Sequence, residues 1–180
     1  MRLLFIQTGG TIDKLYPRST QGYAFEFGDF SATQEIIENE FKAIINFDAD
    51  FITVCKKDST EMNDNDRQNI VDIIKESDSN KYYGIIITHG TDTMIQTAKY
   101  IDKKLLYNNN NKYCIVLTGS MKPAKFIDSD AKFNLGAAIS VVQLIHKYKH
   151  YGVYLTMNGN VFTCNNVKRN YQNGFFVSKL

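Results

Sequence analysis

The segment LLFIQTGG, at residues 3–10, places four consecutive apolar residues directly before a short polar and glycine-rich tail. Runs of the same kind recur along the chain as FITVC (51–55), GIII (84–87), CIVL (114–117) and VYL (153–155). Continuous apolar strands of this length are expected where helices cover both faces of a sheet. The sequence therefore predicts an α/β fold with an open, mainly parallel sheet.

The segments between these runs carry apolar residues at helical spacing. Ser31 and Gln34 fit a capping box, which predicts a first helix from Ser31 to Ile45. Three further helices are predicted to begin at Asn63, at Asp92 or Thr93, and at about Ala131. The fourth extends to Tyr148. Residues 14–29 contain Pro17 and two glycines and predict a flap or hairpin, and residues 108–111 predict a surface turn. Alternating strands and helices favour helices on both sides of the sheet.

Composition narrows the class of protein. The chain has 180 residues, of which 43% are hydrophobic and 22% charged, so we expect one packed domain over residues 1–180. A net charge of +2 gives no reason to expect a nucleic-acid partner, and no run reaches the roughly 20 apolar residues of a membrane span. Cys55, Cys114 and Cys164 lie far apart in apolar stretches, which indicates free thiols and a cytoplasmic location.

Ligands of open parallel sheets bind beyond the carboxyl ends of the strands. The tails that follow the predicted strands are rich in hydroxyls and glycines: Thr8 to Thr11, Ser59 and Thr60, Thr88 to Asp92, Thr118 to Ser120, and Asn158. Their only histidine is His89, so we expect no metal site, and His89 is expected to satisfy a backbone group. TGGTID matches neither GxGxxG nor a phosphate-binding loop, so we expect no nucleotide or other cofactor.

The hydroxyl of Thr11 follows two glycines, whose lack of side chains leaves backbone amides accessible as hydrogen-bond donors. Such an arrangement supplies a nucleophile and an oxyanion site for acyl transfer, provided that a neighbouring group activates the hydroxyl. The residues that would serve are Tyr16 and Tyr23 in the flap, Asp92, and Lys168 or Arg169 near the end of the chain.

Two motifs resemble signatures of the bacterial-type L-asparaginases: TGGTI at residues 8–12 and HGTDTM at 89–94. The similarity continues, in the order of that family, through DSTEMND (58–64), TGSMKP (118–123), SDAKFNLGAA (129–138) and YLTMNGNVF (154–162). The resemblance covers nearly the whole chain. It implies the flavodoxin-like or Rossmann-like sheet of an asparaginase N-terminal domain.

The resemblance also implies a reaction. A threonine nucleophile would attack the side-chain amide of L-asparagine or a related small amide, form an acyl-enzyme and release ammonia. Carried over by position, the catalytic residues would be Thr11, the flap tyrosine Tyr23, and Thr91 with Asp92, completed by Lys168. The substrate-binding residues would be Gly10, Ser59 for the α-carboxylate, Thr60 and Gly90, with Asp92 also taking the α-ammonium and the Thr91 amide donating to the oxyanion.

The chain departs from the family pattern at several points. The smaller C-terminal domain of the family is absent from these 180 residues, and Thr60 and Glu61 stand where Gln and Asp are usual. A shift of one residue decides whether Lys168 or Arg169 takes the lysine position, and Tyr16 competes with Tyr23. Because the family assembles as dimers of dimers, we expect a homodimer or a higher homo-oligomer.

Two other functions stay open from the sequence. One is a non-catalytic module that binds small amino acids in the same pocket. The other is an amidotransferase-like subunit that acts on aminoacyl-tRNA, against which the near-neutral charge weighs.

Overall fold

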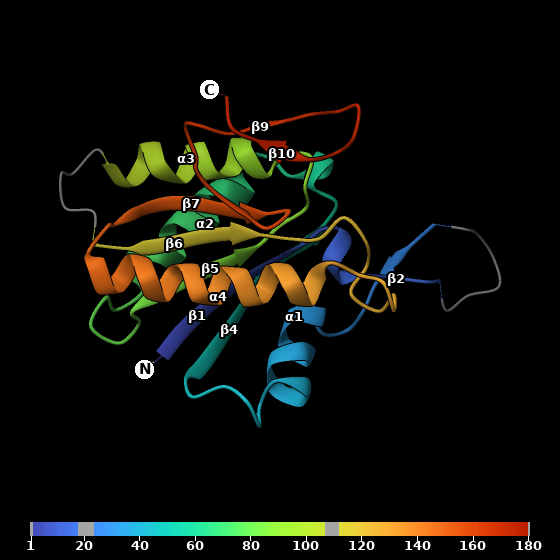
Figure 1. The fold of residues 1–180 in the computed structure, drawn as a ribbon, viewed down its shortest axis with the longest axis horizontal. Helices are drawn as coiled ribbons and strands as arrows, with labels where there is room; N and C mark the ends of the chain where they lie inside the picture. Colours follow the sequence, from blue (N-terminus) through green and yellow to red (C-terminus); the bar gives the residue numbers. More distant parts are fainter. Residues whose placement is uncertain (1, 18–23, 107–111, 180) are drawn as a thin grey trace.

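A computed structural model describes residues 2–17, 24–106 and 112–179 (Figure 1). The strands of its main sheet are Arg2–Gly9 (β1), Asp48–Lys57 (β4), Gly84–Thr88 (β5), Cys114–Thr118 (β6), Gly152–Met157 (β7) and Asn160–Thr163 (β8). Their order in the sheet is β4-β1-β5-β6-β7-β8. All neighbours are parallel except β7 and β8, which form an antiparallel hairpin at the edge.

The chain order of the strands reverses at β1. This strand pairs with β4 on one side and β5 on the other, and Gln7 lies opposite both Thr53 and Thr88. The tails of β1, β4 and β5 therefore meet at one edge of the sheet, where ligands of this architecture bind. The predicted open, mainly parallel sheet is confirmed, whereas the hairpin strand β8 was not predicted.

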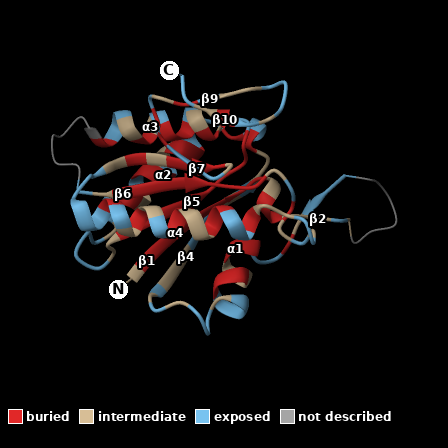
Figure 2. Cartoon of the chain, viewed as in Figure 1, coloured by how far each residue is buried: buried red, intermediate tan, exposed pale blue. Residues whose placement is uncertain are grey.

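Helices cover both faces of the sheet. They are Ala32–Glu35 (α1), continued by the π-helical turn Ile36–Glu40 (η2), Asp64–Glu76 (α2), Met94–Leu106 (α3) and Ala131–Tyr148 (α4). Leu4 and Ile6 of β1 belong to the core beneath α2 and α3, whereas Leu3 and Phe5 point to the core beneath α4. Figure 2 shows the buried strands between these two layers. The apolar strand runs follow from this two-sided burial.

Three predicted helices agree with the structure. The bounds of α4 match the prediction, and α3 begins at Met94, one residue beyond the expected Thr93. Asn63 caps α2 by accepting hydrogen bonds from the backbone nitrogens of Asn65 and Asp66, and the Asp66 carboxylate accepts one from the Asn63 nitrogen in return. Both ends of that capping box are therefore satisfied.

The prediction for residues 31–45 was wrong in two respects. Ser31 does cap α1, but Gln34 donates to the Glu38 carboxylate and does not complete a capping box. The regular helix lasts only four residues, and after η2 the chain turns so that Ile44 is 76% exposed. The apolar spacing of this segment matched a helix, but its later apolar residues are used in a turn and at the sheet edge.

The segment 14–29 forms the predicted hairpin in its described part. Lys14–Leu15 (β2) pairs antiparallel with Glu26–Phe27 (β3), and the pair projects beyond the carboxyl ends of the sheet strands (Figure 1). Tyr23, predicted to be the flap tyrosine, lies outside the described residues, and so does the predicted turn at 108–111. At the end of the chain, Lys168–Arg169 (β9) and Phe176–Val177 (β10) form a second small hairpin beside α3.

The cysteines are free, as predicted. Cys114 and Cys164 are buried and Cys55 is half-buried, and burial raises the pKa of each thiol above its usual value. Among the described residues, no helix is long and apolar enough to cross a membrane.

Candidate active site

The tails of β1 and β5 touch at two glycines. Gly10 has a φ of 80° and a ψ of −173°, which only glycine adopts readily. A Cβ atom on Gly10 would lie 2.3 Å from the backbone nitrogen of Gly90. The two backbones therefore pack against each other without side chains between them, and this contact brings the TGGTI and HGTDTM segments together.

The tail of β4 completes the arrangement. It continues into the 3-10 turn Ser59–Glu61 (η3), and a Cβ atom on Gly90 would lie 2.8 Å from the Ser59 hydroxyl oxygen. The Thr93 hydroxyl donates to the Ser59 carbonyl at 2.7 Å. Ser59 is 1% exposed, and its hydroxyl has no hydrogen-bond partner among the described residues. A buried hydroxyl without a partner is costly, and a ligand that accepts from it would remove that cost.

Thr11 begins the 3-10 turn Thr11–Asp13 (η1) and is held from both sides. The Gly10 nitrogen donates to the Lys57 carbonyl at 2.9 Å, and the Lys14 ammonium lies 2.5 Å from the Asp58 carboxylate. The segment that carries the predicted nucleophile is thus tied to the segment that carries Ser59. Asp58 also caps η3 by accepting from the backbone nitrogen and the hydroxyl of Thr60.

His89 has a structural role, as predicted. Its Nδ1 lies 2.7 Å from the Gly90 carbonyl, so Nδ1 carries the proton and Nε2 accepts from the Thr97 hydroxyl at 2.9 Å. The same hydroxyl accepts from Arg67 Nε at 3.2 Å. Full burial lowers the pKa of His89 to about 4, which keeps the ring neutral. The chain of hydrogen bonds fixes the Gly90 turn against α2 and α3.

Thr91 and Asp92 follow this turn. Thr91 is buried, whereas half of the Asp92 side chain is exposed. The Asp92 carboxylate accepts a hydrogen bond from Nη1 of Arg169. Lys168 is exposed on the same short strand and borders the cavity beside Asp92. Arg169 is thus the cation that contacts Asp92, and a guanidinium there acts as a fixed charge because it does not release its proton.

The loop after β6 is held by side chains at the start of α4. Asp130, at the start of α4, accepts from the backbone nitrogens of Met121 and Lys122, and Asn134 donates to the Gly119 carbonyl at 2.9 Å. These bonds hold the TGSMKP loop next to the site. Asn158 accepts from the Phe176 nitrogen at 2.9 Å, so the side chains of both asparagines fix loops.

The remaining predicted residues are exposed or lie outside the described residues. Tyr23 is not among the described residues. Tyr16 is 70% exposed and stacks on Phe126 with ring centroids 5.4 Å apart, close to Phe25. Thr60 is exposed and its hydroxyl is used by Asp58.

Asp13 was not predicted to belong to the site. It is buried two residues after Thr11, and its carboxylate accepts from the Ser31 hydroxyl and the Ala32 nitrogen, both at 2.8 Å. Burial raises its pKa to about 6 against the effect of these bonds. In the sequence, Asp13 is a single acidic residue directly after an apolar one in TGGTID. Spacing alone does not distinguish such a buried carboxylate from a surface residue.

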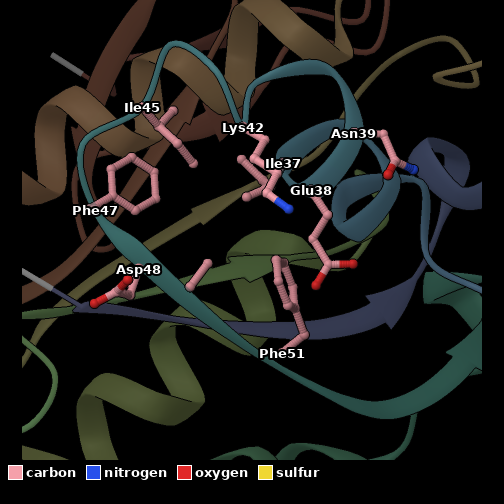
Figure 3. Close-up of a pocket in the computed structure, with 9 residues that line it drawn as sticks. Ile37, Glu38, Asn39, Lys42, Ile45, Phe47, Asp48 and Phe51 are labelled. Atoms are coloured by element: carbon pink, nitrogen blue, oxygen red, sulfur yellow. The ribbon is translucent and has the colours of Figure 1, made fainter.

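Another hollow lies away from the strand tails. It has a volume of about 460 Å³ and is bordered by η2, by the turn after it and by the first residues of β4, among them Ile37, Phe47 and Phe51 (Figure 3). Because it lies at the beginning of β4, it is separated from the candidate site by the length of that strand.

Comparison with known proteins shows the family to which the chain belongs. A family model described as "Asparaginase, N-terminal" matches residues 2–176. The chain belongs to the asparaginase family. A relative named "Probable L-asparaginase periplasmic", from Haemophilus influenzae, is 31% identical over 169 residues, which are 93% of this chain and 46% of that protein. "Glutaminase-asparaginase" of Acinetobacter glutaminasificans is 34% identical over 110 residues, 60% of this chain and 31% of its own.

Solved asparaginase structures share the fold. The thermostable L-asparaginase from Thermococcus kodakarensis has a TM-score of 0.78 and 27% identity, and the match covers 99% of this chain and 51% of that one. "Probable Cytoplasmic L-asparaginase" from Campylobacter jejuni has a TM-score of 0.72 and 27% identity, covering 93% and 50%. The chain thus spans between 31% and 51% of the length of these asparaginases. Because the relatives' names include both periplasmic and cytoplasmic, the cytoplasmic location stays a prediction.

Proposed function

We propose that this protein is an amidohydrolase that releases ammonia from L-asparagine or a related small amide. The observation that carries the proposal is the contact of Gly10 with Gly90 beside the buried hydroxyl of Ser59, which has no hydrogen-bond partner in the described part of the chain. This contact gathers the segments with Thr11, Ser59 and Thr91 at the strand tails. The family membership and the names of the relatives favour the same reaction.

In the proposed reaction, the Thr11 hydroxyl attacks the carbon of the substrate's side-chain amide. Its proton passes to a neighbouring base, for which we propose Tyr23 or Lys168, and the Thr91 amide donates to the developing oxyanion. The amide nitrogen leaves as ammonia, and water then hydrolyses the ester at Thr11. Ser59 would donate to the substrate α-carboxylate, with Gly10, Thr60 and Gly90 bordering it, and Asp92 would attract its ammonium.

Ammonia release from L-asparagine, L-glutamine and short amides tests the proposal. The Thr11→Ala variant is expected to lower kcat on the order of 10³-fold or more, because no other group would form the ester. Ser59→Ala is expected mainly to raise KM. As a matched control, Thr163→Ala removes an exposed threonine hydroxyl from edge strand β8 and should leave the rate unchanged.

Three results would contradict the proposal: no ammonia from any of these amides, full activity of Thr11→Ala, or calorimetric binding of aspartate without turnover. The last would indicate a binding module. Assembly as a homodimer or higher homo-oligomer remains a separate prediction, for which light scattering of the purified chain is the measurement.

A further inference from the structure

A cavity of about 510 Å³ lies between the outer surface of α3 and the segment that contains β9. It adjoins the candidate active site at Asp92 and extends away from it, over Lys99 of α3, to Lys179 near the end of the chain. Its volume is in the range of small-molecule sites, which span roughly 300–1,000 Å³.

The charges around this cavity are strongly unbalanced. Four cations border it, Lys99, Lys168, Arg169 and Lys179, against the single carboxylate of Asp92. Within the described chain, none of the three lysines forms a salt bridge, and the Lys179 ammonium donates to the neutral carbonyl of Asn165 at 2.8 Å. Cations that surround a concave space concentrate positive potential within it, which attracts anions.

Arg169 links this cavity to the candidate site. Its side chain is only 14% exposed, and its guanidinium lies 5.6 Å from the centre of the Tyr171 ring. Nη1 donates to Asp92, but the buried Nε has no hydrogen-bond partner among the described residues. The single carboxylate of Asp92 therefore does not use every N–H donor of this guanidinium, and a second anionic group could accept from the remaining donors.

We propose that this cavity is a binding site for a small molecule with two or more anionic groups, either phosphates or carboxylates. One group would lie among Lys99, Lys168 and Lys179, and another would compete with Asp92 for Arg169. Binding would then loosen the ion pair of Asp92 and make that carboxylate available to the candidate active site. The proposal concerns a second ligand and does not depend on amide hydrolysis.

Calorimetric titration with citrate, pyrophosphate and inorganic phosphate, at constant ionic strength with chloride as the balancing anion, tests the site. We expect Lys99→Gln with Lys179→Gln to weaken binding about tenfold or more, since each substitution removes a charged donor. Asp92→Asn is expected to strengthen binding, because it removes the one carboxylate. A preference for citrate would identify carboxylates, and a preference for pyrophosphate would identify phosphates.

The control is Lys103→Gln with Lys104→Gln, which removes the same charge from exposed positions of the same helix and should not change the affinity. The proposal is overturned if none of the three anions binds above the chloride background. It is also overturned if both lysine pairs weaken binding equally or if Asp92→Asn weakens it. Titration of Thr11→Ala separates this test from hydrolysis, because binding should persist in a variant that cannot turn over.

Discussion

Asp13 shows at the residue scale how burial sets the charge state near the candidate nucleophile. Its carboxylate accepts two hydrogen bonds, from the Ser31 hydroxyl and the Ala32 nitrogen, and both favour the ionised form. Loss of solvation outweighs them and raises the pKa to about 6, from an ordinary value of 3.8. The folded protein therefore binds this proton more tightly than the unfolded chain does.

The contribution of Asp13 to the free energy of unfolding should fall as the pH rises from about 4 to about 6. In that window the folded state retains a proton that the unfolded chain has lost, so raising the pH favours unfolding. Asp13→Asn keeps an acceptor oxygen but does not ionise. Relative to the unmodified protein, this variant should gain up to about 3 kcal/mol between pH 4 and pH 7, measured by urea unfolding.

The control for that measurement is Asp72→Asn, an exposed carboxylate in α2. Its stability should follow the pH dependence of the unmodified protein. Equal profiles for Asp13→Asn and the unmodified protein would show that the Asp13 carboxyl titrates at its ordinary pKa in the folded state.

At the scale of elements, glycine has opposite effects on stability in the β1 tail and in α4. Gly10 has a backbone conformation reserved for glycine and lies against Gly90. Gly136 is inside α4, and a Cβ atom there would meet nothing within 4 Å. Close approach of two backbones requires the first glycine, whereas the second only weakens its helix.

Substitution by alanine should therefore act in opposite directions at these two positions. Gly10→Ala is expected to destabilise the fold on the order of 3 kcal/mol, through strain and the clash with the Gly90 nitrogen. Gly136→Ala is expected to stabilise it by roughly 0.5–1 kcal/mol because alanine is the better helix former. Thermal and urea unfolding of both variants measure the two changes. Equal effects of the two substitutions would contradict the packing of the β1 and β5 tails described above.

Local sequence patterns predicted most elements but not all. The bounds of α4 followed from its apolar spacing, since that helix packs along its whole length on the sheet. The helix after Ser31 did not extend to Ile45 as predicted, because α1 ends at Glu35 and the chain turns away after η2. β8 was missed because this four-residue edge strand, NVFT, lacks the continuous apolar run that marks the other strands of the sheet.

For the whole molecule, stability is concentrated in the middle of the sheet. β1 and β5 each pair with strands on both sides and lie between two apolar layers. Among the described strands, β8 pairs only with β7, and Val161 on it is 53% exposed. The centre should therefore open only when the protein unfolds as a whole, and the edge should open locally.

Hydrogen exchange followed by NMR measures this difference. We expect the amides of β5 to exchange on the order of 10²-fold or more slowly than those of β8, and their exchange to track the free energy of global unfolding in urea. Similar protection in both strands would mean that the sheet opens as a single unit from edge to centre.

The sequence by itself determined the class of fold, the helices α2, α3 and α4, and the strand tails that meet at the candidate site, because apolar periodicity reflects burial on a regular element. Its motifs also indicated the asparaginase family. Only the tertiary structure decided that Gly10 touches Gly90, that the Ser59 hydroxyl is buried beside them, and that Arg169, rather than Lys168, pairs with Asp92. These contacts join residues up to 80 positions apart, from Gly10 to Gly90, and such pairings depend on how the layers pack, which no local pattern encodes.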